Sequence, residues 1–330
     1  ITFNQKVLDV ELDSATLVVQ DNQTQKRTFI ESDCIIGADG AFSSIREKMM
    51  KTDRFNYSQT YIEQGYKELT IPAAPNGDFL LDKNALHIWP RKQYMLIGLP
   101  NLDGSFTCTL FFPFEGNPSF ESLKTDADVL AFFEEEFPDV IPLMPTLLQD
   151  FAHNPTSSLV TVKSFPWSYS DKVLLIGDAS HAILPFFGQG MNAGFEDCTV
   201  LSECLDRHPD NWEIAFKEFE TNRKPNSDAI AELALENFVE MRDKVADLTF
   251  LRRKKIERLI QTQFPESFTS LYSMVTFSHI PYHEAQLIGK KQDVILDKLM
   301  AIENIENEWD STEHQLLILN IIEHYKNTSL

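Results

Sequence analysis

A single carboxylate follows an aliphatic run in the middle of the chain, at a position where ligands are often bound. Val173 to Ile176 are all aliphatic, as is typical of a parallel strand that helices cover on both faces. Gly177 and Asp178 come next, at the carboxyl end of that strand. Sheets of this kind bind their ligands at this edge, so the spacing predicts that Asp178 lies in a ligand site.

The loop after Asp178 has residues that suit a flat ligand. These residues are Pro185, Phe187, Gly188, Gln189 and Gly190. The two glycines have no side chain and let the backbone approach a ligand closely. A helix is predicted to open at Met191 and Asn192, and the free N–H groups of its first turn favour an anionic or electron-rich group. Taken alone, the loop is also compatible with an ordinary strand–turn–helix.

A second strand–turn–helix pattern lies near the start of the chain. Residues 34–38 are predicted to form a short buried strand, and Asp39 and Gly40 form the turn after it. A helix with a serine cap follows over residues 43–49. We expect Asp39 to accept hydrogen bonds and Arg46 to offer its charge to a phosphate. A turn with only a charged helix cap is the alternative.

Together, the two strings resemble the motifs of the FAD-dependent aromatic hydroxylases, the group A monooxygenases. Residues 33–46 are similar to the Asp-Gly motif of that family, and residues 173–197 to its second FAD motif. The resemblance implies that Asp178 meets the ribityl chain of FAD and that the glycine loop faces the flavin ring. It implies FAD and NADPH as cofactors. The cofactor-binding residues that it implies are Asp39, Gly40, Arg46, Gly177, Asp178, Pro185, Gly188, Gln189, Gly190, Met191 and Asn192.

Longer strings narrow the resemblance to the kynurenine hydroxylases within this family. They cover residues 54–72, 86–91, 105–111, 185–198, 236–243 and 272–285. The resemblance implies NADPH- and O2-dependent 3-hydroxylation of L-kynurenine to 3-hydroxy-L-kynurenine, through a flavin C4a-hydroperoxide, in tryptophan catabolism. No catalytic side chain is expected, because the flavin supplies the chemistry and the protein supplies position and electrostatics. His181 is interpreted as a structural residue.

Asn237 is singled out by its position on a predicted helix. It falls on an apolar stripe formed by Ile230, Leu233, Met241 and Val245. An unpaired polar group on such a stripe costs about 1–3 kcal/mol, so the pattern predicts a buried partner, and a satisfied core amide is the alternative. The resemblance adds a role in binding substrate. The substrate-binding residues that it implies are Phe187, Gly188, Gln189, Asn237 and Tyr272.

One element of the family is not found in the sequence. It is the G-x-G-x-x-G turn that binds the pyrophosphate of FAD at a helix N-terminus. The chain also opens without Met, in a strand-rich stretch. We therefore expect an N-terminally truncated chain that lacks the first βαβ unit. The family's Arg and Tyr for the substrate carboxylate have no matching positions here.

Composition excludes several classes of function. The net charge of −21 argues against nucleic acid and anionic membrane surfaces as partners. The four cysteines have no metal-ligand spacing, so we expect no metal and reduced thiols in a cytoplasmic protein, as in bacterial members of the family. No run approaches 18 apolar residues, so no transmembrane segment is expected. The sequence does not indicate an oligomeric state.

The order of the predicted elements indicates an α/β fold with an α+β insert. A partial Rossmann-like FAD-binding domain is expected over residues 1–50 and 166–225, a sheet-rich substrate domain over 51–165, and a helical C-terminal region over 226–330. Residues 1–32 are expected to form an antiparallel meander, and further strands are expected at 61–71, 85–90, 93–99, 105–112 and 159–165.

Helices are predicted in two parts of the chain. Residues 119–150 are expected to be helical, with core anchors at Leu130, Phe132, Phe133 and Phe137. The chain after residue 190 is expected to be helical, with breaks at Pro209, Pro225, Pro265 and Pro281.

Three alternative functions stay open. The first is a related FAD hydroxylase of another aminoaromatic acid, which substrate-dependent NADPH oxidation would distinguish. The second is a non-catalytic fragment that binds an aromatic ligand, which a flavin titration would distinguish. The third is a membrane-attached form, and residues 291–330 are too acidic and too interrupted to favour it.

Overall fold

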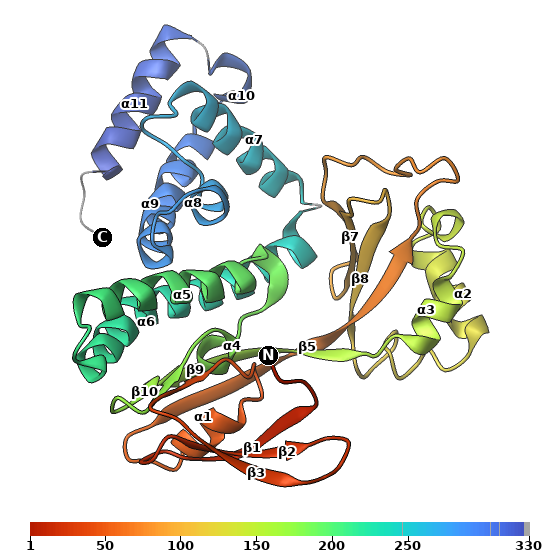
Figure 1. Ribbon diagram of the computed structural model, residues 1–330. Helices are drawn as coiled ribbons and strands as arrows, with labels where there is room; N and C mark the ends of the chain where they lie inside the picture. Colours follow the sequence, from red (N-terminus) through yellow and green to blue (C-terminus); the bar gives the residue numbers. More distant parts are fainter. Residues whose placement is uncertain (246, 304, 310, 327–330) are drawn as a thin grey trace. The chain divides into compact units, whose positions relative to one another are not determined.

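The computed structural model describes residues 1–245, 247–303, 305–309 and 311–326 (Figure 1). The chain divides into two compact units. The first consists of Ile1–Thr60, Val160–Glu236 and Arg252–Leu330, and the second of Tyr61–Leu159 and Asn237–Leu251. The division into an FAD-binding domain, a substrate domain and a helical C-terminal region stays a prediction.

Two small sheets lie in the first unit. Strands β1 (Gln5–Glu11), β2 (Thr16–Asp21) and β3 (Arg27–Glu31) form an antiparallel meander, which confirms the prediction for residues 1–32. Strands β10 (Ser168–Tyr169), β11 (Val173–Leu175) and β4 (Ile35–Gly37) form the other sheet, in that order. Strand β11 runs parallel to β4 and antiparallel to β10.

The two parallel strands differ in burial. All three side chains of β11 are buried, because they are aliphatic and helices pack against them. Strand β4 was expected to be buried as well, but Ile36 is 46% exposed. Side chains of successive residues in a strand point to opposite faces, so Ile35 lies on the other face and joins the core.

Helices make up most of the first unit. They are α1 (Ser44–Met49), α4 (Asp178–His181), α5 (Gly190–Arg207), α6 (Trp212–Val239), α8 (Leu271–Phe277), α9 (Tyr282–Met300), α10 (Ile305–Glu308) and α11 (Thr312–Lys326), with the short helix η2 (Pro185–Phe187). The π-helix η3 (Glu240–Lys244) belongs to the second unit, where α7 (Leu248–Gln263) begins. No helix within the described ranges is long and apolar enough to cross a membrane.

Proline ends helices at three of the four predicted positions. Helix α5 ends before Pro209, α7 ends before Pro265, and Pro281 is the N-cap of α9. The predicted break at Pro225 is wrong, because α6 continues through it. The proline lies on the exposed face, and buried residues hold the helix on both sides of it, among them Phe219 before and Ile230 after. Packing of these two faces offsets the roughly 3 kcal/mol that an interior proline costs.

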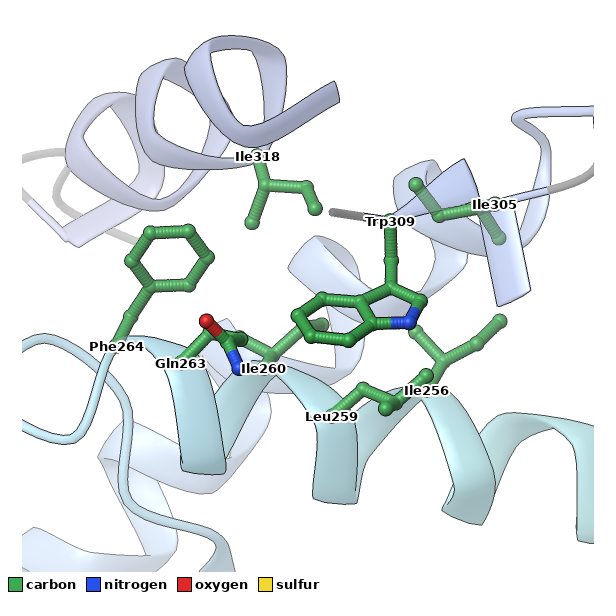
Figure 2. A pocket seen from close by; sticks show the side chains of 8 residues that line it. All are labelled: Ile256, Leu259, Ile260, Gln263, Phe264, Ile305, Trp309 and Ile318. Carbon is green, nitrogen blue, oxygen red and sulfur yellow. The ribbon is translucent and has the colours of Figure 1, made fainter. Parts of the chain in front are cut away.

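The C-terminal helices of the first unit pack around an apolar core. The indole of Trp309 faces the α7 side chains Ile256, Leu259 and Ile260, and Ile318 of α11 lies on the other side (Figure 2). The hollow between them has room for about 10 Å³, which is at the lower limit for a single water molecule. It is therefore a packing defect and offers no space for a ligand.

A five-stranded sheet has the strand order β6 (His87–Pro90), β7 (Met95–Pro100), β8 (Phe106–Pro113), β5 (Asn56–Ile71) and β9 (Ser157–Phe165). It holds the strands β6, β7 and β8 of the second unit together with β5 and β9, whose residues are divided between the two units. All five correspond to predicted strands, and the pairs β6–β7, β7–β8 and β5–β8 are antiparallel.

Helices α2 (Asp126–Glu136) and α3 (Leu147–His153), with the short η1 (Ile141–Leu143), form a core with this sheet (Figure 1). Phe132, Phe133 and Phe137 are buried there as predicted. Leu130 is only half-buried, and Val129 takes the expected core position. Val129 lies three and four residues before Phe132 and Phe133, so these three share one helix face.

Candidate functional site

The two predicted cofactor motifs meet at one edge of a sheet. Strands β4 and β11 are parallel neighbours, with Gly37 opposite Leu175. The Ile176 N–H continues this ladder by donating to the Gly37 carbonyl over 3.0 Å. The segments that begin at Asp39 and at Gly177 therefore leave the sheet at the same carboxyl edge, where parallel sheets bind ligands. The structure thus brings together two motifs that are more than 130 residues apart.

Asp39 is occupied within its own turn. One carboxylate oxygen accepts hydrogen bonds from the N–H groups of Ser44, over 2.8 Å, and Ile45, over 3.3 Å. The other accepts from the Ser43 hydroxyl over 2.5 Å. Gly40 follows with a φ of +82°, a conformation that favours glycine. Asp39 therefore shapes the turn and the start of α1, and contact with the cofactor stays a prediction.

Arg46 anchors α1 to the neighbouring motif. Its side chain is buried, and its Nη1 donates to the Ala179 carbonyl over 2.7 Å and its Nη2 to the Ala41 carbonyl over 2.5 Å. The guanidinium lies 5.0 Å from the centre of the Tyr57 ring, within range of a cation–π contact. Its Nε is buried without a partner in the part of the chain that the structure describes. Arg46 thus ties the two motifs together, and its role toward a phosphate stays a prediction.

The residues around Gly177 and Gly188 form an open cradle, which fits a flat cofactor. Both glycines have a positive φ, +57° and +65° respectively, and a Cβ added to either would meet no atom within 4 Å. Asp178 is exposed, and its carboxylate has no hydrogen-bond or ion-pair partner among the described residues. An exposed carboxylate, which accepts hydrogen bonds, beside two open glycine backbones offers an acceptor and space for a flat ligand that carries hydroxyl groups.

The first turn of α5 completes this surface. No side chain caps the turn, so its N–H groups are not satisfied by a cap. Met191 and Asn192 are exposed there, as is Pro185 one turn earlier. The N-terminal dipole of this 18-residue helix favours negative charge at this position. The position therefore suits an anionic group of a ligand, and contact with the flavin stays a prediction.

Two predicted substrate residues are stacked on each other. The rings of Phe187 and Tyr272 have centroids 5.8 Å apart and planes 26° apart. Tyr272 is 48% exposed and also meets Phe277 edge-on at 6.2 Å. The pair offers an aromatic surface beside the glycine loop, which suits an aromatic ligand. Gln189, also predicted to meet substrate, is buried below the loop.

Asn237 belongs to the second unit, near the end of α6. It is half-buried, and its Nδ2 donates to the sulfur of the buried Met241 at 3.5 Å. The predicted buried partner is thus present, although a thioether is a weak acceptor. The π-helix η3 begins three residues later, and such segments are frequent at functional sites. The role of Asn237 toward substrate stays a prediction.

A buried ion network supports the Gly177 turn, and the sequence analysis did not identify it. Asp197 accepts from the Gly177 N–H at 2.8 Å, from His181 Nε2 at 2.7 Å and from Arg223 Nε at 2.7 Å. Arg223 also pairs with Glu196 at 2.7 Å. An arginine four positions after Phe219, on the same face of the predicted helix as that apolar residue, was the available signal.

The network keeps Asp197 ionised. Burial opposes the charge, but the hydrogen bond and charge of His181, the charge of Arg223 and the Gly177 N–H together lower the pKa of the Asp197 carboxyl. A carboxylate that accepts several hydrogen bonds and faces a buried guanidinium is held in its charged form. His181 is thus a partner of Asp197, in line with its interpretation as structural.

One further hollow opens in the first unit and adds no free charge. It has a volume of about 450 Å³ and is lined by Tyr57, residues 163–165 and Lys224, among others. Lys163 pairs with Glu232, and Lys224 with Asp228. Over the described ranges, no cluster of His, Cys, Asp and Glu could hold a metal ion.

Comparisons with known proteins agree with this geometry. An FAD binding domain family matches residues 1–212. Kynurenine 3-monooxygenase of Flavobacterium psychrophilum is 53% identical over 320 residues, covering 97% of this chain and 72% of that protein. The enzyme of the same name from Dictyostelium discoideum is 51% identical, with 90% and 66% covered, and that from Sus scrofa is 47% identical, with 81% and 56% covered.

Solved structures show the same fold at low sequence identity. Tetrameric 2-methyl-3-hydroxypyridine-5-carboxylic acid oxygenase matches with a TM-score of 0.58 and 23% identity, covering 73% of this chain and 62% of that one. A variant of Klebsiella pneumoniae HpxO complexed with FAD matches with a TM-score of 0.58 and 20% identity, covering 78% and 66%. The identity and coverage of the relatives show that the chain belongs to the kynurenine 3-monooxygenase family of FAD-dependent monooxygenases.

Proposed function

We propose that this protein uses FAD, NADPH and O2 to hydroxylate L-kynurenine to 3-hydroxy-L-kynurenine in the cytoplasm. The observation that carries the proposal is the cradle at the sheet edge, where Asp178 and the open Gly177 and Gly188 lie beside the Phe187–Tyr272 stack. The names of the relatives support the choice of substrate, and the open glycine backbones support the cradle as the place for the cofactor.

Each group of residues has a defined task in this proposal. Bound FAD would supply the electron transfer and the oxygen activation. Asp178 would accept hydrogen bonds from the ribityl hydroxyls, and the N-terminus of α5 would favour negative charge on the ring. Phe187 and Tyr272 would hold the aromatic substrate against the loop and exclude water from it. The amino group of kynurenine activates its own ring, so no side chain has to act as a base.

The activity is tested on the full-length protein by following NADPH oxidation with and without L-kynurenine, with the product identified by mass. We expect stimulated oxidation and the addition of one oxygen atom to kynurenine. Oxidation that ignores kynurenine would contradict the substrate and favour another aminoaromatic acid. Failure to bind FAD in a flavin titration would favour the non-catalytic alternative.

The cradle itself is tested by Gly188→Ala, with Gly77→Ala as the matched control. Both glycines have a positive φ and open space at the Cβ position, so both substitutions carry the same backbone strain, about 1–2 kcal/mol. Gly77 lies in a turn of the second unit. We expect similar losses of thermal stability, and at least a tenfold weaker FAD affinity only in Gly188→Ala, since its methyl group would occupy the flavin space. Equal FAD affinity in both variants would show that the cradle does not face the flavin.

A further inference from the structure

Tyr282 places a buried hydroxyl next to the glycine loop, outside the residues that form the cradle. It is the first residue of α9 and is 8% exposed. Its hydroxyl donates to Gln189 Oε1 over 2.9 Å, and Gln189 is itself only 4% exposed. A hydrogen bond in such a dry setting is stronger than one at the surface, and leaving either group unpaired there would be costly.

Gln189 connects this hydroxyl to the whole loop. Its Oε1 accepts a second hydrogen bond from Asn192 Nδ2 over 3.2 Å, and its Nε2 donates to the Phe187 carbonyl at 3.4 Å. The amide therefore links the residue that stacks on Tyr272 with the first turn of α5. Gly188, between them, is held in the left-handed region and has no Cβ to restrict it. The loop conformation consequently depends on the orientation of this one amide.

Packing and a neighbouring hydrogen-bonded residue hold Tyr282 in place. The ring packs in an apolar cluster with Ala193 of α5, Ile230 of α6 and Met274 of α8. The next residue, His283, bonds through its backbone N–H and its Nδ1 to Asn226 Oδ1, at 3.3 and 2.9 Å. A hydroxyl held by packing on three sides can fix the position of the group that it binds.

The hydroxyl stays protonated over the working range of pH. Burial, with the nearby Glu196 charge, raises the pKa of Tyr282 to about 12. It can therefore donate to Gln189 throughout neutral pH.

We propose that Tyr282 is a positioning residue of the hydroxylation: through the Gln189 amide it fixes the Phe187–Gly190 turn against which flavin and substrate are held. The inference rests on the proposed function for the identity of the ligands. The effect of Tyr282 on the loop conformation is independent of the proposed function, because the hydrogen bonds involved lie within the chain.

The test compares Tyr282→Phe with Tyr94→Phe in the full-length protein loaded with FAD. Tyr94 of the second unit is a matched control, since it is 7% exposed and its pKa is also raised to about 12, by burial and by the nearby Glu136. Two readouts do not need turnover: hydrogen–deuterium exchange of residues 185–192, and the kynurenine Kd from the change that it causes in the flavin absorption spectrum. A third is the fraction of NADPH oxidation that yields hydroxylated product.

For Tyr282→Phe we expect faster exchange at residues 185–192, a three- to tenfold higher Kd for kynurenine and a lower product yield. The FAD content of this variant should equal that of Tyr94→Phe. In a Gln189→Ala background, Tyr282→Phe should add little to the change in Kd, because both act through one amide. Unchanged exchange and Kd, additive effects in the double variant, or equal FAD loss in both tyrosine variants would overturn the proposal. If the wild-type protein shows no response to kynurenine, the proposed function fails, and the exchange comparison still decides the role of Tyr282.

Discussion

At the scale of single residues, the Asp197 carboxylate joins the Gly177 turn to two helices. It binds the Gly177 N–H, His181 of α4 and Arg223 of α6 while fully buried. We expect Asp197→Asn to lower the free energy of unfolding by about 3 kcal/mol, because a buried arginine loses one of its two carboxylates and the amide keeps a single oxygen for the three hydrogen bonds that Asp197 accepts. Thermal unfolding checks the loss of stability, and FAD titration checks the effect on the Gly177 turn.

Asp297→Asn is the control for this substitution. Arg253 also pairs with two carboxylates, Asp293 and Asp297, but the Asp297 side chain is 72% exposed. Exposed pairs contribute about 0–1 kcal/mol, so this variant should be almost neutral. Equal destabilisation of the two variants would show that the Asp197 network adds nothing beyond an ordinary surface pair.

The Asp197 carboxylate also makes the stability of the protein depend on pH. Because its pKa is lowered on folding, the unfolded chain binds more protons in the acidic range. The stabilisation is therefore complete above 3.8, the ordinary pKa of an aspartate, and is lost as pH falls through the lower pKa of the folded state. Unfolding measured between pH 7 and pH 3 should show a steeper acid loss in the wild type than in Asp197→Asn.

The role of Asn237 can be tested by measuring substrate binding and cofactor binding separately. Its Nδ2 donates to the Met241 sulfur at 3.5 Å, and a thioether is a weak acceptor. We expect Asn237→Ala to raise the KM for L-kynurenine at least fivefold with the FAD content unchanged. Parallel loss of FAD and stability would indicate a core amide, the alternative that the helical stripe left open.

At the scale of elements, α6 carries a proline that its packing overrides. Pro225 lies on the exposed face, where it withholds one backbone hydrogen bond from the helix. Pro225→Ala should raise the melting temperature by a few degrees, because it restores that bond at a solvent-facing position. Pro281→Ala is the opposite control, since Pro281 is an N-cap and its loss should lower stability by about 0.4–1 kcal/mol. A lower melting temperature in both variants would show that Pro225 stabilises α6.

Local patterns in the sequence predicted the elements well, and long-range contacts account for the rest. The strands, the Ser43 cap and the family motifs were readable because each depends on a few adjacent residues. Pro225 was misread because residues of two separate clusters hold α6 together. The partners of Asp197 and Tyr282 lie 16 to 93 residues away in sequence, and single-sequence periodicity does not identify such pairs.

At the scale of the whole molecule, the charge of −21 acts on every anionic ligand that approaches. NADPH carries several negative phosphate charges, whereas L-kynurenine is a neutral zwitterion at pH 7. Salt screens exposed charges over about 10 Å at 0.1 M, so raising the ionic strength from 0.01 to about 0.15 M should increase the NADPH association rate about two- to tenfold. Stopped-flow flavin reduction measures this rate, and the kynurenine Kd, read from the flavin spectrum, should stay constant as the internal control. A rate that falls with salt would instead show that a local basic surface attracts NADPH strongly enough to outweigh the net charge of the chain.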